Sequence, residues 1–236
     1  MVKKLAFIAC LLIAAILALG LWSYQGAVLH VPVSEKVVAL TFDDGPNPPY
    51  TAELLSLLEE RGVRASFFPK ARNVEAFPEA AREIVRAGHE IGNHSYDHLP
   101  MTSLSKADMQ AEIVRSNRVL EEVMGVQPRL FRPPFGAQSL GVKLALRELG
   151  MVSVLASAHG SDWEEDNPDR IAAAVLADIE PGVIVLLHDG HGDVADPHSQ
   201  DSRSASVAAT GILIEKLREQ GYRLVTVGEL LAMRKL

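Results

Sequence analysis

The sequence contains almost no cysteine and carries no excess of positive charge. Its only cysteine, Cys10, excludes an internal disulfide, whatever the redox state of the compartment. Lys and Arg total 23 against 30 Asp and Glu, so the formal net charge of −7 has the wrong sign for binding a nucleic-acid backbone. Internal repeats and low-complexity tracts are also absent. We therefore expect a single folded unit that has no nucleic-acid partner.

The N-terminal region differs in composition from the rest of the chain. Lys3 and Lys4 precede an uncharged, mostly aliphatic run over residues 5–22, which is about long enough to cross a hydrocarbon core. Positive charge ahead of such a run keeps the N-terminus in the cytoplasm and sends the remainder outward. The small residues at 18–20 make only a mediocre cleavage site. We predict a hydrophobic helix within residues 1–26, acting as a membrane anchor or, if cleaved, as a signal peptide.

The remaining residues, 27–236, are long enough and apolar enough for one domain of barrel size. Short β-branched runs alternate there with longer stretches of helical spacing, which is typical of parallel βα units. Strands are expected at 37–42, 64–68, 90–93, 129–131, 152–156, 183–187 and 223–227. Helices are expected at 51–60, 78–87, 106–124, 140–149, 168–179, 205–219 and from 228. The seven units predict an α/β fold, a deformed (β/α)7 TIM-like barrel, with an open doubly wound sheet as the alternative.

Two short motifs carry the candidate chemistry: residues 41–46, with Asp43 and Asp44, and residues 94–98, with His94 and His98. Two imidazoles and one carboxylate supply three of the four ligands of a tetrahedral zinc and leave one position for water. Neighbouring aspartates after a strand point different ways, so one can hold the metal while the other faces its water. Taken singly, the first motif could be an ordinary turn and the second a solvated loop or helix face.

Polar residues follow several of the expected strands. They are Asp43 and Asp44 after the first strand, His94 and His98 after the third, Arg132 after the fourth, and His188 and Asp189 after the sixth. Because the carboxyl ends of parallel barrel strands converge on one face, we expect these distant residues to meet there.

Five motif blocks stand in one order along the chain: residues 41–46, 94–98, 132–136, 161–163 and 186–189. With them, residues from about 37 to 231 resemble the polysaccharide deacetylase family, also called the NodB-homology domain or carbohydrate esterase family four. The resemblance implies that residues 27–236 form the catalytic domain. It also implies metal-assisted hydrolysis of N-acetyl, or sometimes O-acetyl, groups on sugar polymers.

The resemblance assigns roles on the metal side of the reaction. Asp44, His94 and His98 match the family's metal ligands, and a bound zinc lowers the pKa of its water to about 7. Asp43 matches the general base. Arg132 matches the arginine placed against that base, and its charge would keep the Asp43 carboxylate ionised and aimed.

Further roles follow on the side of the leaving group. His188 resembles the general acid, with Asp162 bonded to its other ring nitrogen. The backbone amide of Phe135 would stabilise the oxyanion, and many relatives have tyrosine at this position. Trp163 and Leu186 would enclose the acetyl methyl group, although ordinary core packing explains these two residues equally well.

Two segments depart from the family pattern. Residues 67–71 run from paired phenylalanines into Pro-Lys-Ala, where relatives more often have aliphatic residues and a glycine. Residues 189–203 form a long polar loop, which we interpret as a solvated rim of the cleft in preference to a second metal site. Arg64, near the start of the second expected strand, is a candidate for steadying Asp162.

The leading hypothesis is an exported, metal-dependent N-deacetylase of peptidoglycan N-acetylglucosamine or a chitin-like oligosaccharide, acting as a monomer on an acetylated polysaccharide. It would face outward from the membrane or be secreted. Zinc is the expected metal, with cobalt, nickel or manganese as alternatives. Rival functions are an O-acetyl esterase and a noncatalytic glycan-binding envelope protein. A noncatalytic protein would be expected to have lost Asp43 or His188, and both are present. Adjacent Asp43 and Asp44 cannot flank a glycosidic bond, which argues against a glycosidase.

Overall fold

The computed structural model describes residues 26–192, 196–199 and 202–234. The predicted anchor or signal peptide at residues 1–26 therefore lies outside the described residues, except for Gly26. No helix within the described ranges has the length and apolar character needed to cross a membrane. The predicted N-terminal hydrophobic helix remains a prediction.

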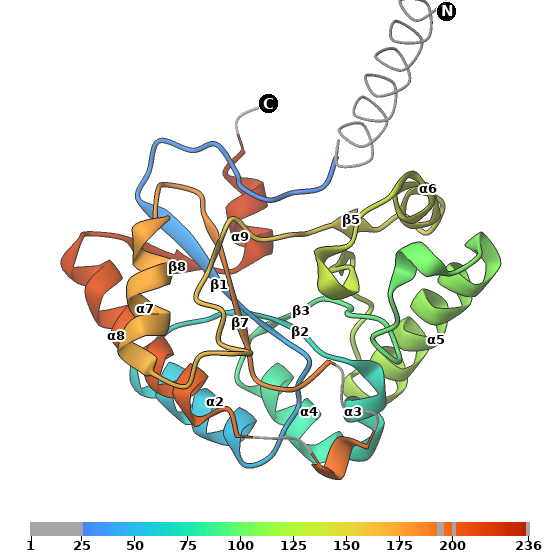
Figure 1. Cartoon of the computed structure of the whole chain (residues 1–236), viewed down its shortest axis with the longest axis horizontal. Coiled ribbons are helices and arrows are strands. Elements are labelled where there is room, and N and C mark those ends of the chain that lie inside the picture. Colours follow the sequence, from blue (N-terminus) through green and yellow to red (C-terminus); the bar gives the residue numbers. More distant parts are fainter. Residues whose placement is uncertain (1–25, 193–195, 200–201, 235–236) are drawn as a thin grey trace, which may run out of the picture.

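A parallel sheet forms the centre of the domain (Figure 1). Its strand order is β3-β2-β1-β7-β6, and β8 pairs with the opening half of β1. The strands are β1 (Val37–Asp43), β2 (Ser66–Phe68), β3 (Glu90–Ile91), β6 (Ala158–His159), β7 (Ile184–His188) and β8 (Arg223–Val225). All seven residues of β1 are buried, which explains why it reads as a nearly continuous apolar run.

A second, smaller pairing completes the strand arrangement. β4 (Leu130–Phe131) and β5 (Val152–Ser153) run parallel to each other. Single bridges join this pair to its neighbours, Asn93 to Phe131 and Val28 to Val154, and a third bridge joins His30 to Val183 just before β7. The strands therefore follow one another around a ring in which some neighbouring strands are joined only by a single bridge. This arrangement is consistent with a deformed barrel.

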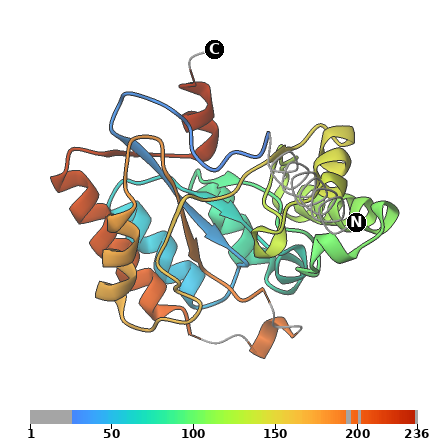
Figure 2. The ribbon, with the colours of Figure 1, turned by 45° about the horizontal axis from the view of Figure 1, so that its top comes forward.

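Helices lie around the outside of the strands, with β1 and β7 in the middle (Figures 1 and 2). They are α2 (Tyr50–Glu60), α3 (Ala71–Ala76), α4 (Pro78–Arg86), α5 (Lys106–Met124), α6 (Leu140–Glu148), α7 (Pro168–Ala177), α8 (Ser204–Glu219) and α9 (Val227–Ala232). Short 3-10 turns are η1 (Met101–Ser103), η2 (Pro134–Gly136) and η3 (Pro197–Ser199). The local sequence explains where several of these helices begin or end. Asn167 caps α7 ahead of a proline, and Gly125 ends α5 in a left-handed conformation.

The prediction of parallel βα units is confirmed, and two elements were missed. Strand β6 has no β-branched residue or phenylalanine, whereas the equally short β3, β4 and β5, which were predicted, contain Ile91, Phe131 and Val152. Helix α3 has six residues shortly after β2, and no helix was predicted there, because its buried residues, Ala71, Asn73 and Val74, do not form an apolar stripe. The expected fifth strand is also shorter than predicted, because its ladder stops at Ser153.

Candidate active site

The described residues include five non-glycine residues with positive φ, and all five lie in the motif blocks. They are Asp44, Ser95, His98, Phe135 and Ser161. Such left-handed conformations cost about 1–3 kcal/mol each and persist only where the surroundings enforce them. Backbone strain therefore gathers at the same loops that carry the candidate chemistry.

Asp44, His94 and His98 converge as predicted, from the loops after β1 and β3. The Oδ1 atom of Asp44 lies 3.4 Å from Nε2 of His94 and 3.6 Å from Nε2 of His98. Ligands of a tetrahedral zinc lie about 3.3 Å from one another, given metal–ligand distances of about 2.0–2.1 Å. All three side chains are buried, and within the described ranges Asp44 Oδ1 accepts no hydrogen bond. These three residues fit a divalent metal ion.

The His94 ring is oriented for metal binding by its other nitrogen. Its Nδ1 lies 2.7 Å from the carbonyl oxygen of Arg132, so an Nδ1–H donor there leaves the Nε2 lone pair facing Asp44 and His98. Burial lowers the pKa of His94 to about 3, although the nearby Asp44 charge acts in the opposite direction. The ring is therefore neutral at physiological pH, as a metal ligand must be.

Asp43 is held by Arg132, as the resemblance implied. Arg132 Nη1 donates to Asp43 Oδ1 at 2.7 Å and to Thr41 Oγ1 at 2.7 Å. The guanidinium also lies over the Phe68 ring, 4.3 Å from its centroid. The other carboxylate oxygen, Oδ2, lies 3.6 Å from His94 Nε2 and so faces the metal ligands. Burial outweighs the Arg132 charge and raises the pKa of Asp43 above its ordinary value, the opposite of the expected direction.

His188 and Asp162 form the predicted pair, at the end of β7 beside Asp43. His188 Nδ1 lies 2.8 Å from Asp162 Oδ1, and the His188 backbone N–H donates to Asp162 Oδ2 at 2.8 Å. The Ser206 hydroxyl in α8 donates to the same Oδ2 at 2.7 Å. Burial alone would lower the pKa of His188, but the Asp162 carboxylate raises it to about 9. His188 is therefore protonated at neutral pH.

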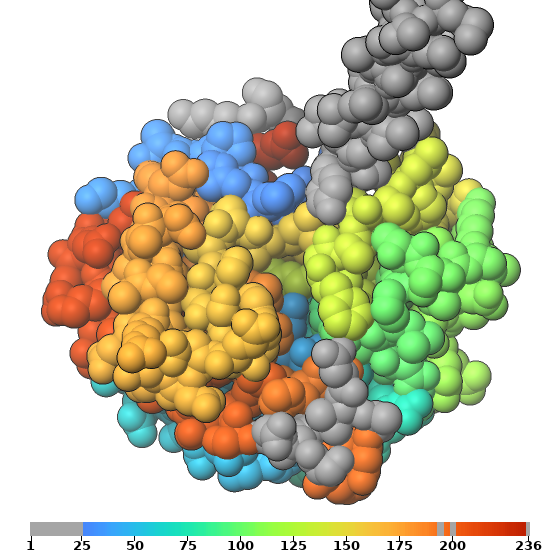
Figure 3. Space-filling model, viewed as in Figure 1, coloured from blue at the N-terminus to red at the C-terminus, as the bar shows by residue number. Residues whose placement is uncertain are grey.

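Two aromatic side chains flank these groups and remain open to solvent. Phe135 is 57% exposed, and its ring centroid lies 4.5 Å from that of His98. Trp163 is 41% exposed and meets the His188 ring edge-on, with the centroids 5.4 Å apart. Leu186 is half-buried in β7. Figure 3 shows a hollow near the middle of one face, with blue atoms of the early chain at its bottom, between a yellow-orange and a yellow-green segment.

The interpretation of residues 189–203 as a solvated rim is wrong at both ends of the loop. Asp189 is buried and accepts a hydrogen bond from Thr51 Oγ1 at 2.7 Å. Burial, reinforced by the charges of Asp44 and Asp43, raises the pKa of Asp189 to about 7. Arg203 is also buried, and its guanidinium donates hydrogen bonds to the backbone carbonyls of Gly190 and Asp162.

Arg64 does not approach Asp162. It pairs with Glu229 of α9, so the suggestion that it steadies Asp162 is wrong. Asp162 is instead held by Ser206 and Arg203. No sequence pattern indicated either residue, because Ser206 lies in a helix of ordinary periodicity and Arg203 in a polar loop. Lys70 was noticed as a departure from the family pattern, but nothing in the sequence indicated that it is fully buried.

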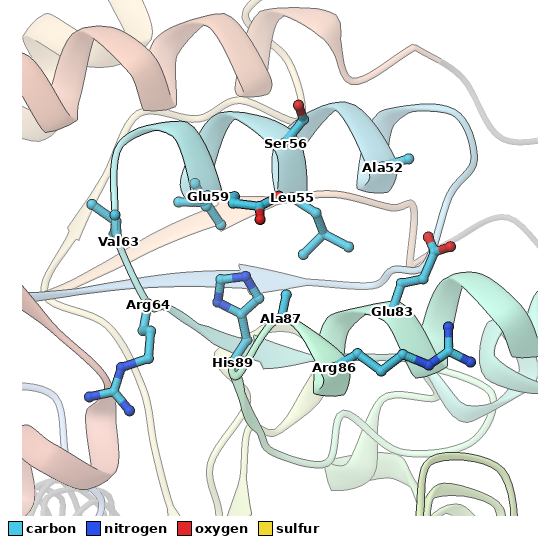
Figure 4. A pocket seen from close by; sticks show the side chains of 12 residues that line it. Ala52, Leu55, Ser56, Glu59, Val63, Arg64, Glu83, Arg86, Ala87 and His89 are labelled. Carbon is cyan, nitrogen blue, oxygen red and sulfur yellow. The ribbon is translucent and has the colours of Figure 1, made fainter.

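A cavity of about 650 Å³ lies elsewhere, between α2 and α4, and none of the residues above except Arg64 line it (Figure 4). Its charged groups include Arg64, which pairs with Glu229, and Arg86, which pairs with Glu79. The candidate site and this cavity are separate features.

Comparisons with known proteins agree with the geometry. The family model described as polysaccharide deacetylase matches residues 30–154. A peptidoglycan-N-acetylglucosamine deacetylase of Bacillus cereus is 38% identical over 204 residues, covering 86% of this chain and 91% of that protein. A chitooligosaccharide deacetylase of a Bradyrhizobium species is 35% identical over 192 residues, covering 80% of this chain and 88% of that protein.

A solved structure with this fold shows that the fold alone does not guarantee activity. The crystal structure of a CE4 family pseudoenzyme from Bacillus anthracis superposes with a TM-score of 0.80 at 29% identity, covering 89% of this chain and 70% of that chain. The site residues of each chain therefore carry the functional argument.

Proposed function

This chain belongs to the polysaccharide deacetylase family, and we propose that it removes N-acetyl groups from peptidoglycan N-acetylglucosamine or a chitin-like oligosaccharide. That it is a glycan deacetylase follows from its family and relatives. The choice of an N-acetyl group and of these glycans, and the roles of individual residues, are the proposal.

One observation carries the proposal: a buried metal-ligand triangle with a carboxylate on one side and a protonated histidine on the other. Asp43 and His188 are register partners at the ends of neighbouring strands β1 and β7. A proton acceptor and a proton donor therefore lie side by side, next to the metal ligands. A divalent ion held by Asp44, His94 and His98 would supply a water activated near neutral pH and an electrophile for the acetyl oxygen.

The chain's own residues would divide the proton transfers. Asp43 Oδ2, which faces the metal ligands, would accept the proton of the attacking water while Arg132 fixes Oδ1. His188 would donate a proton to the leaving nitrogen from its Nε2, because Nδ1 is held by Asp162. The left-handed Phe135 would present its backbone N–H to the developing oxyanion. Trp163 and Leu186 would contact the acetyl methyl group.

The state of His188 favours an amide substrate over an ester. An amine leaves only when it is protonated, whereas an alkoxide of lower basicity depends less on a proton donor. A histidine whose pKa is raised to about 9 remains a proton donor throughout the neutral range. N-deacetylation therefore stands ahead of O-deacetylation. The full set of base, acid and metal ligands also argues against a noncatalytic glycan-binding protein.

The test is acetate release from purified peptidoglycan and from N-acetylglucosamine oligomers, with product analysis to show which sugar loses its acetyl group. Asp43→Asn should lower acetate release by about 10²–10⁴-fold while glycan binding persists. No acetate release by either protein, with glycan binding retained, would support a binding role alone. Acetate release only from O-acetylated glycans would support the esterase.

Zinc is the proposed ion, since two imidazoles and a carboxylate suit it, although cobalt, nickel and manganese also accept these ligands. Metal analysis of the purified protein, followed by reconstitution of the stripped protein with each ion in turn, distinguishes them. If the protein reconstituted with another ion at its physiological concentration were more active than the zinc form, that ion would be assigned in place of zinc.

We further propose that the domain acts outside the cytoplasm as a monomer, anchored by residues 1–26 or released by their cleavage. The lysines and the aliphatic run described above support export. Membrane fractionation of cells making the full chain, with N-terminal sequencing of the mature protein, separates anchor from signal peptide. Size-exclusion chromatography with light scattering tests the monomer.

A further inference from the structure

Three successive backbone carbonyls beside the candidate site accept hydrogen bonds from two buried cations. Lys70 Nζ donates to His191 O at 3.0 Å and to Gly192 O at 3.2 Å. Arg203 Nε donates to Gly190 O at 2.8 Å. Lys70 is 1% exposed and Arg203 is 4% exposed, which is rare for these residue types.

The tripeptide 190–192 lies against two of the metal ligands. A Cβ on Gly190 would lie 2.4 Å from the carbonyl oxygen of Asp44, and one on Gly192 would lie 2.3 Å from the His98 ring. Neither glycine has a positive φ, so close approach is the constraint at both positions. The glycines let this backbone pack directly on Asp44 and His98.

We propose that Lys70 and Arg203 are positioning residues of the metal centre, holding residues 190–192 against Asp44 and His98 as a clamp. This inference rests on the proposed function, because it takes Asp44, His94 and His98 as ligands. The clamp joins the two segments that depart from the family pattern, since Lys70 lies in residues 67–71 and its acceptors open the loop 189–203.

The clamp works because backbone carbonyls in a buried place need donors. One lysine ammonium can donate to two adjacent carbonyls, which a neutral apolar side chain at position 70 cannot do. Arg203 also donates from Nη1 to Asp162 O at 2.9 Å, so it ties the same tripeptide to the loop that carries the acid-side carboxylate. Without these donors, residues 190–192 would move away from the ligands, and the ligands would lose a wall that fixes their orientation.

The first experiment removes the donor while keeping most of the length of the side chain. Apo protein is titrated with zinc against a chromophoric chelator, comparing wild type with Lys70→Met, Lys70→Arg and Lys36→Met. The Kd for zinc should rise by about 10- to 100-fold in Lys70→Met, as outer-shell substitutions commonly produce. Lys70→Arg should recover part of the affinity. Lys36 donates to Gln220 O on the exposed surface and serves as the matched control, with no expected change.

A second variant reaches the same tripeptide from the other side. Gly192→Ala should displace the His98 ring and weaken zinc binding by a similar factor, whereas Gly211→Ala, whose Cβ would meet Leu57 at an ordinary 3.7 Å, should not. This comparison decides the matter if Lys70→Met fails to fold. Zinc affinities within about 2-fold of wild type in the folded Lys70→Met and Gly192→Ala proteins would overturn the clamp while leaving the deacetylase proposal intact. A wild-type protein that binds no divalent ion would instead overturn the proposed metal centre itself.

Discussion

His94 and His188 lie in the same site and have opposite protonation states. Burial lowers the pKa of His94 to about 3, and a backbone carbonyl at its Nδ1 supplies no full charge to reverse this. His188 is subject to the same burial effect, yet the Asp162 carboxylate at its Nδ1 raises its pKa to about 9. At His94 the Asp44 charge offsets burial only in part, whereas at His188 the Asp162 carboxylate, together with the charges of Asp44 and Asp43, outweighs it.

The surroundings of the two histidines differ less than their protonation states. On the metal side the ligands are buried, and the backbone is strained at Asp44 and His98. On the acid side the His188 side chain is 13% exposed. Each side carries one aromatic residue open to solvent, Phe135 against His98 and Trp163 against His188. Four substitutions, taken in order of decreasing effect, test whether the two halves work separately.

Removing a metal-side imidazole should have the largest effect. His94→Ala should lower acetate release by about 10³-fold or more, because a lost metal ion withdraws several kcal/mol of transition-state stabilisation. Stripping the wild-type protein with a chelator should give the same loss, and zinc should reverse it. The exposed His159, beside Trp163, gives the control variant His159→Ala, which should bind zinc normally. Zinc binding by His94→Ala at wild-type affinity would contradict the ligand assignment.

Removing the acid-side imidazole should cost less and leave the metal centre intact. His188→Ala should lower kcat by about 10²–10⁴-fold, the usual contribution of general acid catalysis. Its Kd for zinc should equal that of wild type. A coupled loss of zinc affinity in this variant would show that the two histidines do not divide the work as the structure indicates.

Changing the partner of His188 should convert its environment toward that of His94. In Asp162→Asn the carboxylate charge that holds the proton is gone, so the pKa of His188 should fall from about 9 toward its ordinary 6.5 or lower. General acid activity is lost as pH rises through this pKa, so the alkaline limb of the kcat profile should move to lower pH. We expect a loss of roughly 10- to 100-fold at pH 8 from deprotonation alone. An unmoved alkaline limb would assign it to another group.

The smallest effect should come from the hydroxyl behind the dyad. Ser206→Ala removes one donor to Asp162 and leaves its bonds with His188, so kcat should fall by about 2- to 5-fold and the free energy of unfolding by about 1 kcal/mol. Kinetics and urea denaturation measure the two. Thr210→Ala, which removes a hydroxyl that donates to Ser206 O in the same helix, is the comparison and should leave kcat unchanged. A drop in kcat larger than that of Asp162→Asn would contradict this ranking of the two substitutions.

The sequence alone predicted much of the fold and which candidate site residues lie close together. The strand-helix alternation predicted parallel βα units, and β1 is visible in it because all seven of its residues are buried. The position of polar residues after strands predicted that Asp44, His94 and His98 would meet. Two short elements were missed because their side chains gave no signal: β6 (Ala158–His159) has no β-branched residue or phenylalanine, and α3 buries only Ala71, Asn73 and Val74.

Residue type and order along the chain therefore fixed which groups could do chemistry in this protein, because ligand and proton-transfer capacity belong to the side chains themselves. Their protonation states and surroundings came from the folded arrangement. It set the raised pKa of Asp43, the opposite pKa values of His94 and His188, and the burial of Lys70 and Arg203 against residues 190–192. The reason is physical: desolvation and through-space partners depend on segments that lie far apart in the sequence, and no local pattern records them.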